Sequence, residues 1–303
     1  EMVSPSLKRK YRNQQNINWY PGHMLMAKKE LAGQLKRVDV VLEMRDARIP
    51  VSSVNQDFEE LLGHKKRILI FNKTALADQE VTRKWEESFR RTQDIPFLFI
   101  DALMKSHLQK LLPLSRKIMQ EKWSAFRRRG IRPPTHKLLI CGIPNVGKSS
   151  LINRLSGRKA AETGPAPGVT KHQEWIKLGS DVELLDTPGI LWPKIENQET
   201  GLRLAITGAI KDSVVGTSQL SIFLIGILKQ KLPEKFQKFY QLSQEELTLF
   251  PEDIIQKIAE NRGCLKRGGT IDKTRTESLV LRDFRQGKLG RLSFDHPNPA
   301  DEV

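Results

Sequence analysis

Short apolar runs alternate with amphipathic segments from residue 17 to about residue 190. Each run is short and flanked by polar residues, which is typical of strands in a mostly parallel sheet. We expect strands at 38–44, 67–71, 97–100, 137–141, 174–178 and 182–185. The amphipathic segments predict a helix that ends at residue 37 and further helices at 82–91, 107–128 and 150–155. This alternation predicts an α/β fold with a doubly wound, mostly parallel sheet.

The pattern changes near residue 201, where apolar residues begin to recur at helical spacing. The segments that show this spacing are 202–210, 220–228, 236–240 and 254–258. We therefore expect an α/β domain at 17–205 and a smaller, mostly helical domain at 206–303. Residues 1–16 are rich in basic side chains, and we expect them to form a mobile extension.

Composition narrows the possible partners. Lys and Arg total 51 against 35 Asp and Glu, a formal charge of +16, which favours a polyanion such as nucleic acid or an anionic membrane. The longest apolar stretch, 222–228, is far shorter than the roughly 20 residues that span a bilayer, so we expect no membrane partner. The two cysteines form no metal cluster or disulfide framework, and Cys141 ends an apolar run as a core residue would. We expect a reducing, cytoplasmic location.

Residues 142–149, GIPNVGKS, match the phosphate-loop pattern G-x-x-x-x-G-K-[ST]. In such a loop the backbone N–H groups surround the β-phosphate, and the following helix adds positive potential. Lys148 would reach the β- and γ-phosphate oxygens. The alternative is a chance glycine-lysine turn, which the predicted strand before it and helix after it argue against. The nucleotide contacts expected here are Pro144, Asn145, Val146, Gly147, Lys148, Ser149 and Ser150.

Three further groups complete a predicted site for Mg²⁺ and the γ-phosphate. The Ser149 hydroxyl and Asp186, which opens the segment DTPG, are expected to hold Mg²⁺. Thr170 would complete the coordination when a triphosphate is bound, and the Gly189 N–H is expected to bond the γ-phosphate. The four letters DTPG are weak evidence alone, but these elements in this order and spacing are a specific signature of a GTP/GDP site.

The segment 72–75, NKTA, resembles the guanine motif N-K-x-D. Asn72 would hold the base and the loop, and the Lys73 stem would cover the ring. Ala75 replaces the aspartate that accepts from guanine N1–H and N2–H, so we expect weaker and less selective guanine binding. Asp78 is the nearest carboxylate, and it either caps the next helix, which we favour, or contacts the base.

A second base loop is expected at Asp101 and Ala102, where related GTPases place a backbone N–H against guanine O6. Both base loops precede the phosphate loop, the reverse of the Ras-like order. A sheet tolerates this because the motifs need only meet in space. The segment after Asp186 then leads directly into the C-terminal domain, which gives nucleotide-dependent movement a route to that domain.

These motifs resemble those of the YlqF/RbgA family of circularly permuted ribosome-assembly GTPases. The resemblance covers roughly residues 17–295 and implies GTP hydrolysis during maturation of the large ribosomal subunit. Ala75 departs from the family pattern. The matching segments are WYPGHM at 19–24, DARIP at 46–50, GIPNVGKSSLINRL at 142–155, PGVT at 167–170, LLDTPGILWPK at 184–194, GLRLAITGAIKD at 201–212 and GRLSF at 290–294.

Hydrolysis needs a group that orients water, and Ras-like enzymes carry a glutamine after the DxxG motif. This chain has Ile190 there, which cannot polarise water. The resemblance implies His23 as the catalytic group, and the alternative is that His23 only closes an aromatic turn. Asn145 is similar to the asparagine that helps potassium-activated GTPases hold K⁺, and an ordinary loop role is equally open.

Two basic clusters favour contact with folded rRNA through its shape and phosphates. One cluster, Lys122 with Arg127, Arg128, Arg129 and Arg132, is expected at the domain junction. The other lies between residues 261 and 293 and includes Arg262, Lys266, Arg267, Arg282, Arg285, Lys288 and Arg291.

The leading hypothesis is therefore a GTPase that binds the large-subunit precursor and leaves on hydrolysis. An RNA-binding scaffold with weakened nucleotide selectivity is the alternative, although a scaffold need not keep a Mg²⁺ site. A related GTPase of the small subunit would carry a zinc-binding cysteine cluster or an added OB-fold, and two cysteines form no such cluster.

Overall fold

The computed structural model describes residues 17–18, 22–92, 94–157, 175–187, 194–195 and 197–297. For residues 17, 18, 22–28, 56–58 and 194, the structure describes the backbone but not the side chains. The chain divides into two compact units, one of residues 19–193 with 295–303 and one of residues 1–18 with 194–294. The predicted boundary after residue 205 lies later than this division. Helix α8 (Gln198–Ile206) belongs to the second unit because it packs on α9 and α10 there.

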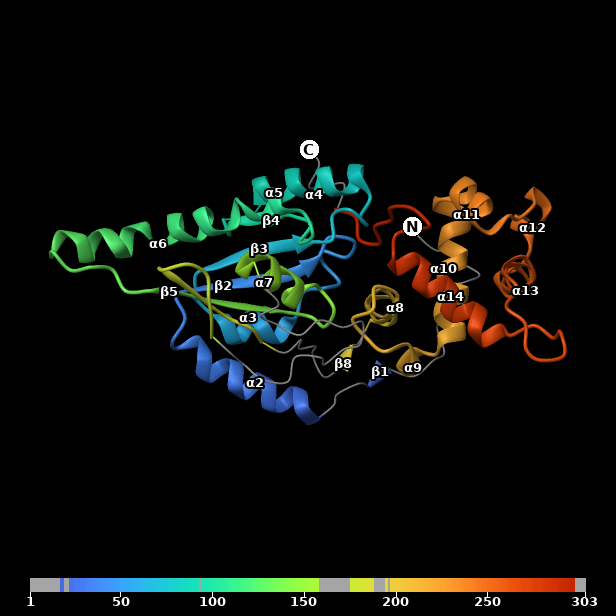
Figure 1. Ribbon diagram of the computed structural model, residues 1–303, viewed down its shortest axis with the longest axis horizontal. Helices are drawn as coiled ribbons and strands as arrows, with labels where there is room; N and C mark the ends of the chain where they lie inside the picture. Colours follow the sequence, from blue (N-terminus) through green and yellow to red (C-terminus); the bar gives the residue numbers. More distant parts are fainter. Residues whose placement is uncertain are drawn as a thin grey trace. The chain divides into compact units, whose positions relative to one another are not determined.

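The first unit is built on the predicted mixed, mostly parallel sheet (Figure 1). Its strand order is β4-β3-β2-β5-β7-β6, and only β6 runs antiparallel to its neighbour. The strands are β2 (Val40–Asp46), β3 (Arg67–Asn72), β4 (Phe97–Phe99), β5 (His136–Gly142), β6 (Trp175–Lys177) and β7 (Val182–Leu185). β2, β3 and β5 are buried along almost their whole length, which explains their unbroken apolar runs.

Helices cover this sheet because their apolar stripes match its buried positions. Leu31 and Leu35 of α2 pack with Val41, Leu139 and Leu185 of three strands. A second cluster joins α4 to β3 through aromatic rings. The helices are α2 (Gly22–Leu35), α3 (Gln56–Leu62), α4 (Gln79–Thr92), α5 (Lys105–Leu108), α6 (Leu111–Arg128) and α7 (Lys148–Ser156). The sequence pattern did not predict α3.

The strand order fixes where a ligand can bind. The chain proceeds from β2 outward to β3 and β4, and from β5 outward to β7 on the other side. The order therefore reverses between β2 and β5, and ligands of doubly wound sheets bind at the carboxyl ends of strands at such a switch point. Asp46, Asn72, Gly142 and Asp186 all lie at or directly after carboxyl ends of these strands.

The second unit is mostly helical, as predicted, and is centred on α10 (Thr217–Lys231). α10 buries residues on every side, including Leu220, Leu224 and Leu228, and packs on α8, α9, α11, α13 and α14. Its other elements are α9 (Asp212–Val215), α11 (Pro233–Tyr240), α12 (Gln244–Thr248), α13 (Pro251–Arg262), α14 (Lys273–Arg285) and a two-stranded pair of β1 (Ile17–Asn18) and β8 (Lys194–Ile195). Among the residues described, no helix is long and apolar enough to cross a bilayer.

Candidate nucleotide-binding site

The phosphate loop connects β5 to α7 and is shaped by Gly147. This glycine has φ +105°, a left-handed conformation, and a Cβ there would lie 2.3 Å from Nδ2 of Asn72. Only glycine satisfies both conditions. Asn145 also has a positive φ of 56°. α7 then begins at Lys148, so its first N–H groups lie next to the loop, as the sequence predicts.

Lys148 is buried, with 6% of its surface exposed, and its Nζ donates to the carbonyl oxygens of Gly142 and Ile143 at 3.2 and 3.0 Å. Burial lowers the pKa of this ammonium to about 8, and the nearby Asp186 carboxylate only partly opposes the shift. Among the described groups this buried cation donates to two neutral carbonyls and to no anion, so it attracts an anion strongly. The loop is therefore electrostatically suited to phosphate.

Asp186 lies next to the phosphate loop because β7 pairs in parallel with β5. The Thr187 hydroxyl donates to Ile140 O at 2.7 Å and holds the start of the segment. Burial raises the pKa of Asp186 to about 6, although Lys148 and a hydrogen bond from Ser149 lower it. Its Oδ1 is buried and accepts no hydrogen bond from any described group.

A hydroxyl and a carboxylate with one unpaired oxygen are a donor set that suits Mg²⁺. Mg²⁺ prefers oxygen ligands and commonly uses one or two protein groups together with water and phosphate oxygens. Ser149 and Asp186 would hold it, and the ion would neutralise phosphate charge. No cluster of three or more His, Cys, Asp or Glu side chains exists in the described part of the chain, so a metal site made only of protein groups is not found there.

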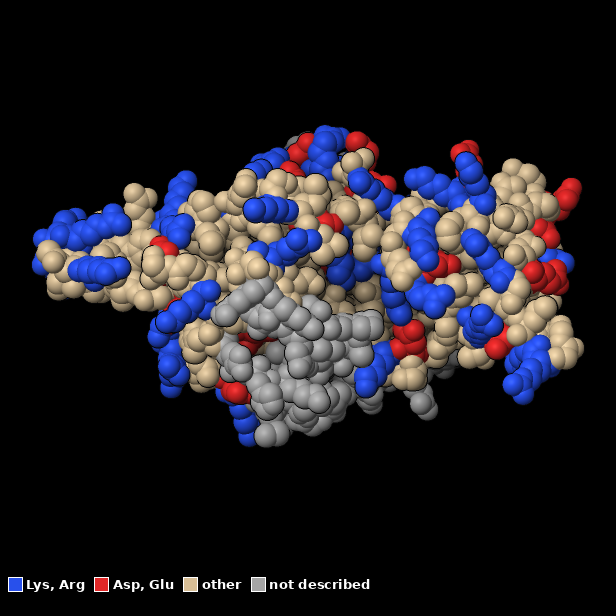
Figure 2. Space-filling view, viewed as in Figure 1, with Lys and Arg blue, Asp and Glu red and all other residues tan. Residues whose placement is uncertain are grey.

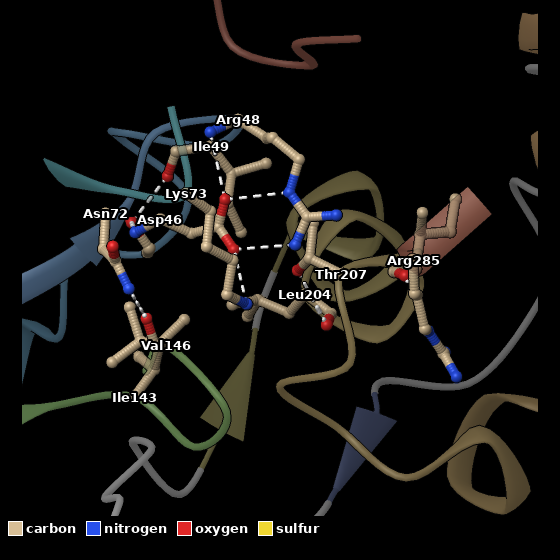
Figure 3. A network of polar contacts seen from close by, with 12 residues as sticks. Asp46, Arg48, Ile49, Asn72, Lys73, Ile143, Val146, Leu204, Thr207 and Arg285 are labelled. Atoms are coloured by element: carbon tan, nitrogen blue, oxygen red, sulfur yellow. Dashed lines mark hydrogen bonds and ion pairs between the residues drawn. The ribbon is translucent and has the colours of Figure 1, made fainter. Parts of the chain in front are cut away.

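Asn72, at the end of β3, joins both base loops to the phosphate loop. Its Nδ2 donates to Val146 O at 2.8 Å (Figure 3). Its Oδ1 accepts from the Ala102 N–H at 2.8 Å. The amide therefore uses its donor on one loop and its acceptor on the other. The Ala102 N–H, predicted to contact guanine O6, is directed at Asn72 in this structure.

Lys73 is held by a carboxylate that the sequence analysis did not single out. Asp46, at the end of β2, lies 3.1 Å from the Lys73 ammonium and makes a bidentate pair with Arg48 at 2.9 and 2.7 Å (Figure 3). Burial opposes ionisation of Asp46, but Arg48 and Lys73 outweigh it and hold its pKa well below the usual range. The motif DARIP supplied the signal, because its acid and arginine follow a strand two positions apart.

The turn after DARIP is fastened by a residue near the other end of the chain. The Asp295 carboxylate accepts from the backbone N–H groups of Val51 and Ser52 at 2.8 and 2.6 Å, and from the Ser52 hydroxyl at 2.8 Å. The Trp85 indole donates to the Asp295 carbonyl at 3.2 Å. No local pattern in the sequence indicates this contact, which spans 244 positions.

The remaining residues that the sequence predicts for the site differ in their surroundings. Ala75 is exposed, and Asp78 caps α4 by accepting from the Val81 N–H at 3.0 Å, as we favoured. Asp101 is buried. Pro144 and Val146 are buried and Ser150 is half-buried at the start of α7. The His23 side chain and residues Thr170 and Gly189 lie outside the described parts of the structure.

The basic residues between 261 and 293 fall into two groups. Arg285 pairs with Asp212 and donates to two backbone carbonyls of α8, Lys288 pairs with Asp283, and Arg262 lies over the rings of Phe239 and Tyr240. These three side chains already have partners within the second unit. The other predicted RNA contacts, Lys266, Arg267, Arg282 and Arg291, form no ion pair with a described residue. They are exposed, as Arg262 and Lys288 also are.

The other basic cluster is not at a domain junction, which corrects the expectation from the sequence. α6 leads into β5 within the first unit, and its end extends beyond the strands (Figure 1). Residues 127–132, with the sequence RRRGIR, are all exposed there. Lys and Arg dominate this end in the space-filling view (Figure 2). None of the four arginines forms an ion pair with a described residue.

The carboxyl edge of one mostly parallel sheet carries a phosphate loop, two residues suited to Mg²⁺ (Ser149 and Asp186) and two base loops. This arrangement defines a P-loop GTPase. Because the base loops come first in the chain, the domain is circularly permuted. Residues 137–255 match the family model described as 50S ribosome-binding GTPase. The chain belongs to the ribosome biogenesis GTPase A family, also called YlqF or RbgA, as the resemblance of its motifs predicted.

The relatives cover nearly the whole chain. Ribosome biogenesis GTPase A of Bacillus licheniformis is 44% identical over 93% of this chain and 98% of its own length. Mitochondrial ribosome-associated GTPase 1 of Mus musculus is 33% identical over 91% and 89%. The GNP-bound crystal structure of YlqF from Thermotoga maritima has a TM-score of 0.61 and 28% identity, covering 90% of this chain and 99% of that one. The chain is thus a GTPase of the ribosome biogenesis class, and the scaffold alternative is not favoured.

Proposed function

We propose that this GTPase assembles the large ribosomal subunit in the cytoplasm, binds its precursor through rRNA, and leaves when GTP is hydrolysed. The observation that carries the proposal is the phosphate loop together with Ser149 and Asp186. Lys148 is buried without an anionic hydrogen-bond acceptor, and Asp186 Oδ1 is buried without any partner among the described groups. A protein that had lost nucleotide hydrolysis would gain stability by replacing both groups, because each is costly to bury.

Each residue of the site has a role in this mechanism. Lys148 and the N–H groups of the phosphate loop bind the phosphates, and Ser149 and Asp186 hold Mg²⁺, which supplies charge neutralisation when bound. Thr170 completes the coordination with triphosphate, and the Gly189 N–H bonds the γ-phosphate. His23 positions the attacking water, since Ile190 cannot. Asn145 would help to hold K⁺, which would supply the charge that an arginine finger supplies in other GTPases.

The rRNA contacts in this proposal are made by basic side chains, in each unit, that form no ion pair with a described residue. These are Lys266, Arg267, Arg282 and Arg291 in the second unit and the four arginines at the end of α6 in the first. With a net charge of +16, these side chains favour phosphate contacts that release counterions. Arg262, Arg285 and Lys288 contribute mainly to the fold.

The direct test is GTP hydrolysis by the full chain with and without purified large subunits, in Mg²⁺ buffers with K⁺ or Na⁺. We expect hydrolysis that requires Mg²⁺, rises with large subunits and is faster in K⁺. Equal rates with large subunits, small subunits and no subunits would contradict the proposed role, and equal rates in K⁺ and Na⁺ would remove only the potassium step.

A further inference from the structure

The base site poses a chemical problem. Guanine differs from adenine by donors at N1 and N2, and a site that selects guanine needs an acceptor facing both. A buried donor left without an acceptor costs about 1–3 kcal/mol. Ala75 offers no side-chain acceptor at the usual position, yet the chain belongs to a family of GTPases. Another carboxylate must supply the acceptor.

The nearby carboxylates can be compared by what they already bind. Asp46 forms ion pairs with both Arg48 and Lys73. Asp78 caps α4 through the Val81 N–H. Both are therefore committed to structural contacts. Asp101 is the remaining carboxylate in the two base loops.

Asp101 lies beside the segment that contains Ala75, because the two base loops are joined by backbone and side-chain hydrogen bonds. The Thr74 N–H donates to Ile100 O at 3.2 Å, and the Ala102 N–H donates to Asn72 Oδ1 at 2.8 Å. Asp101 therefore sits between two residues that are each bonded to the NKTA loop. Its loop is therefore held directly against the loop that contains Ala75.

The Asp101 side chain is also held in one orientation. Its backbone N–H donates to His107 Nδ1 at 2.8 Å, and its Oδ1 accepts from the Leu103 N–H at 2.9 Å. Its Oδ2 accepts no hydrogen bond from the described residues, although the residue is only 7% exposed. A fixed, buried carboxylate with one oxygen still available suits recognition of a planar ligand.

We propose that Asp101 is the guanine-reading carboxylate of this protein and replaces the aspartate that Ala75 lacks. Its carboxylate accepts from guanine N1–H and N2–H while Asn72 and Lys73 keep their places in the loop. This inference rests on the assignment of a guanine nucleotide to the site. It also replaces the expectation that Ala75 leaves the protein poorly selective.

The test is competition binding of GDP, XDP and ADP to the full chain and to four variants. Asp101→Asn keeps the turn to Leu103 but exchanges one acceptor for a donor. It should weaken GDP binding about five- to 150-fold, which corresponds to the roughly 1–3 kcal/mol of a bidentate base contact. XDP, whose C2 carbonyl accepts where guanine donates, should gain relative to GDP. ADP binding should stay unchanged, and the matched control Asp78→Asn should leave all three ratios unchanged.

The decisive variant adds Ala75→Asp to Asp101→Asn. If the carboxylate has only changed loops, this double variant should recover GDP selectivity, whereas Ala75→Asp alone should add little because two carboxylates would share one pair of donors. A wild-type GDP-to-ADP ratio in Asp101→Asn would overturn the proposal. An equal loss of GDP and ADP would also overturn it, since Asp101 would then only support the loop. Failure of the GTPase role itself appears separately, as absence of hydrolysis by the wild-type chain.

Discussion

The nucleotide site and the basic surface of the second unit differ in how well the sequence predicts the role of each residue. In the nucleotide site, each motif residue is fixed by strand ends and backbone bonds, so spacing alone predicts what Lys148, Asp186 and Asn72 do. In the second unit, Arg282 and Arg285 lie three positions apart on α14, yet one is exposed and the other pairs with Asp212. A charged side chain acquires its role from what it packs against. Charge patterns therefore locate a surface but do not assign its residues.

The largest effect is expected at the catalytic step. His23→Ala should lower GTP turnover on large subunits by roughly 10²–10⁴-fold, the usual contribution of a general acid or base. GTP affinity should change little, because binding depends on the phosphate loop. Single-turnover hydrolysis and equilibrium binding measure the two quantities separately. Wild-type turnover at saturating subunits would leave His23 with a structural role only.

Removal of the lysine that binds the phosphates is expected to weaken nucleotide binding. Lys148→Ala should weaken GTP binding by roughly 10- to 150-fold, because hydrogen bonds to a charged group contribute about 1.5–3 kcal/mol each. The variant should fold, since the side chain bonds only two loop carbonyls. Calorimetry with GTP and thermal unfolding measure both outcomes. Unchanged affinity would remove the phosphate-site assignment.

Asp186 gives a pH test of the same site in the nucleotide-free protein. Its pKa is raised to about 6, so it resists ionisation in the folded state. Its contribution to stability is complete below pH 4 and is lost as pH rises through 6. Asp186→Asn should therefore be more stable than the wild type above pH 6, by up to about 3 kcal/mol at 1.36 kcal/mol per pKa unit, and equal to it near pH 4. A stability difference independent of pH between 4 and 8 would contradict this account.

Local motifs allowed much of the fold and site to be predicted. The β strands and the phosphate loop follow from short buried runs and from a glycine whose conformation no other residue adopts. The Asp295 contact was not predictable, because it joins positions 244 apart in the sequence. The sequence pattern did not predict α14 because charged residues separate its apolar positions, although Thr276, Val280 and Phe284 recur at helical spacing and are buried. Asp101 was noted for its backbone, while its carboxylate matters only once the two base loops are known to be joined.

The smallest effects are expected for substitutions of the two arginines of α14, Arg282 and Arg285. They test whether packing, and not charge pattern, assigns the role of a basic side chain. Arg285→Ala should destabilise the second unit by about 1–2 kcal/mol, because it removes a half-buried ion pair and the Arg285 donor to the Ile206 carbonyl, while Ala205 O keeps the Gly208 N–H. Arg282→Ala should change stability by less than about 0.5 kcal/mol, as surface substitutions usually do.

For RNA binding, the order of the two effects reverses. Arg282→Ala should lower the slope of log affinity against log salt by about one, whereas Arg285→Ala should leave the slope nearly unchanged while the protein is folded. Urea unfolding and salt titrations with a large-subunit rRNA fragment measure the two quantities on the same samples. Equal changes in both quantities for both variants would show that exposure does not divide these arginines into structural and RNA-binding residues.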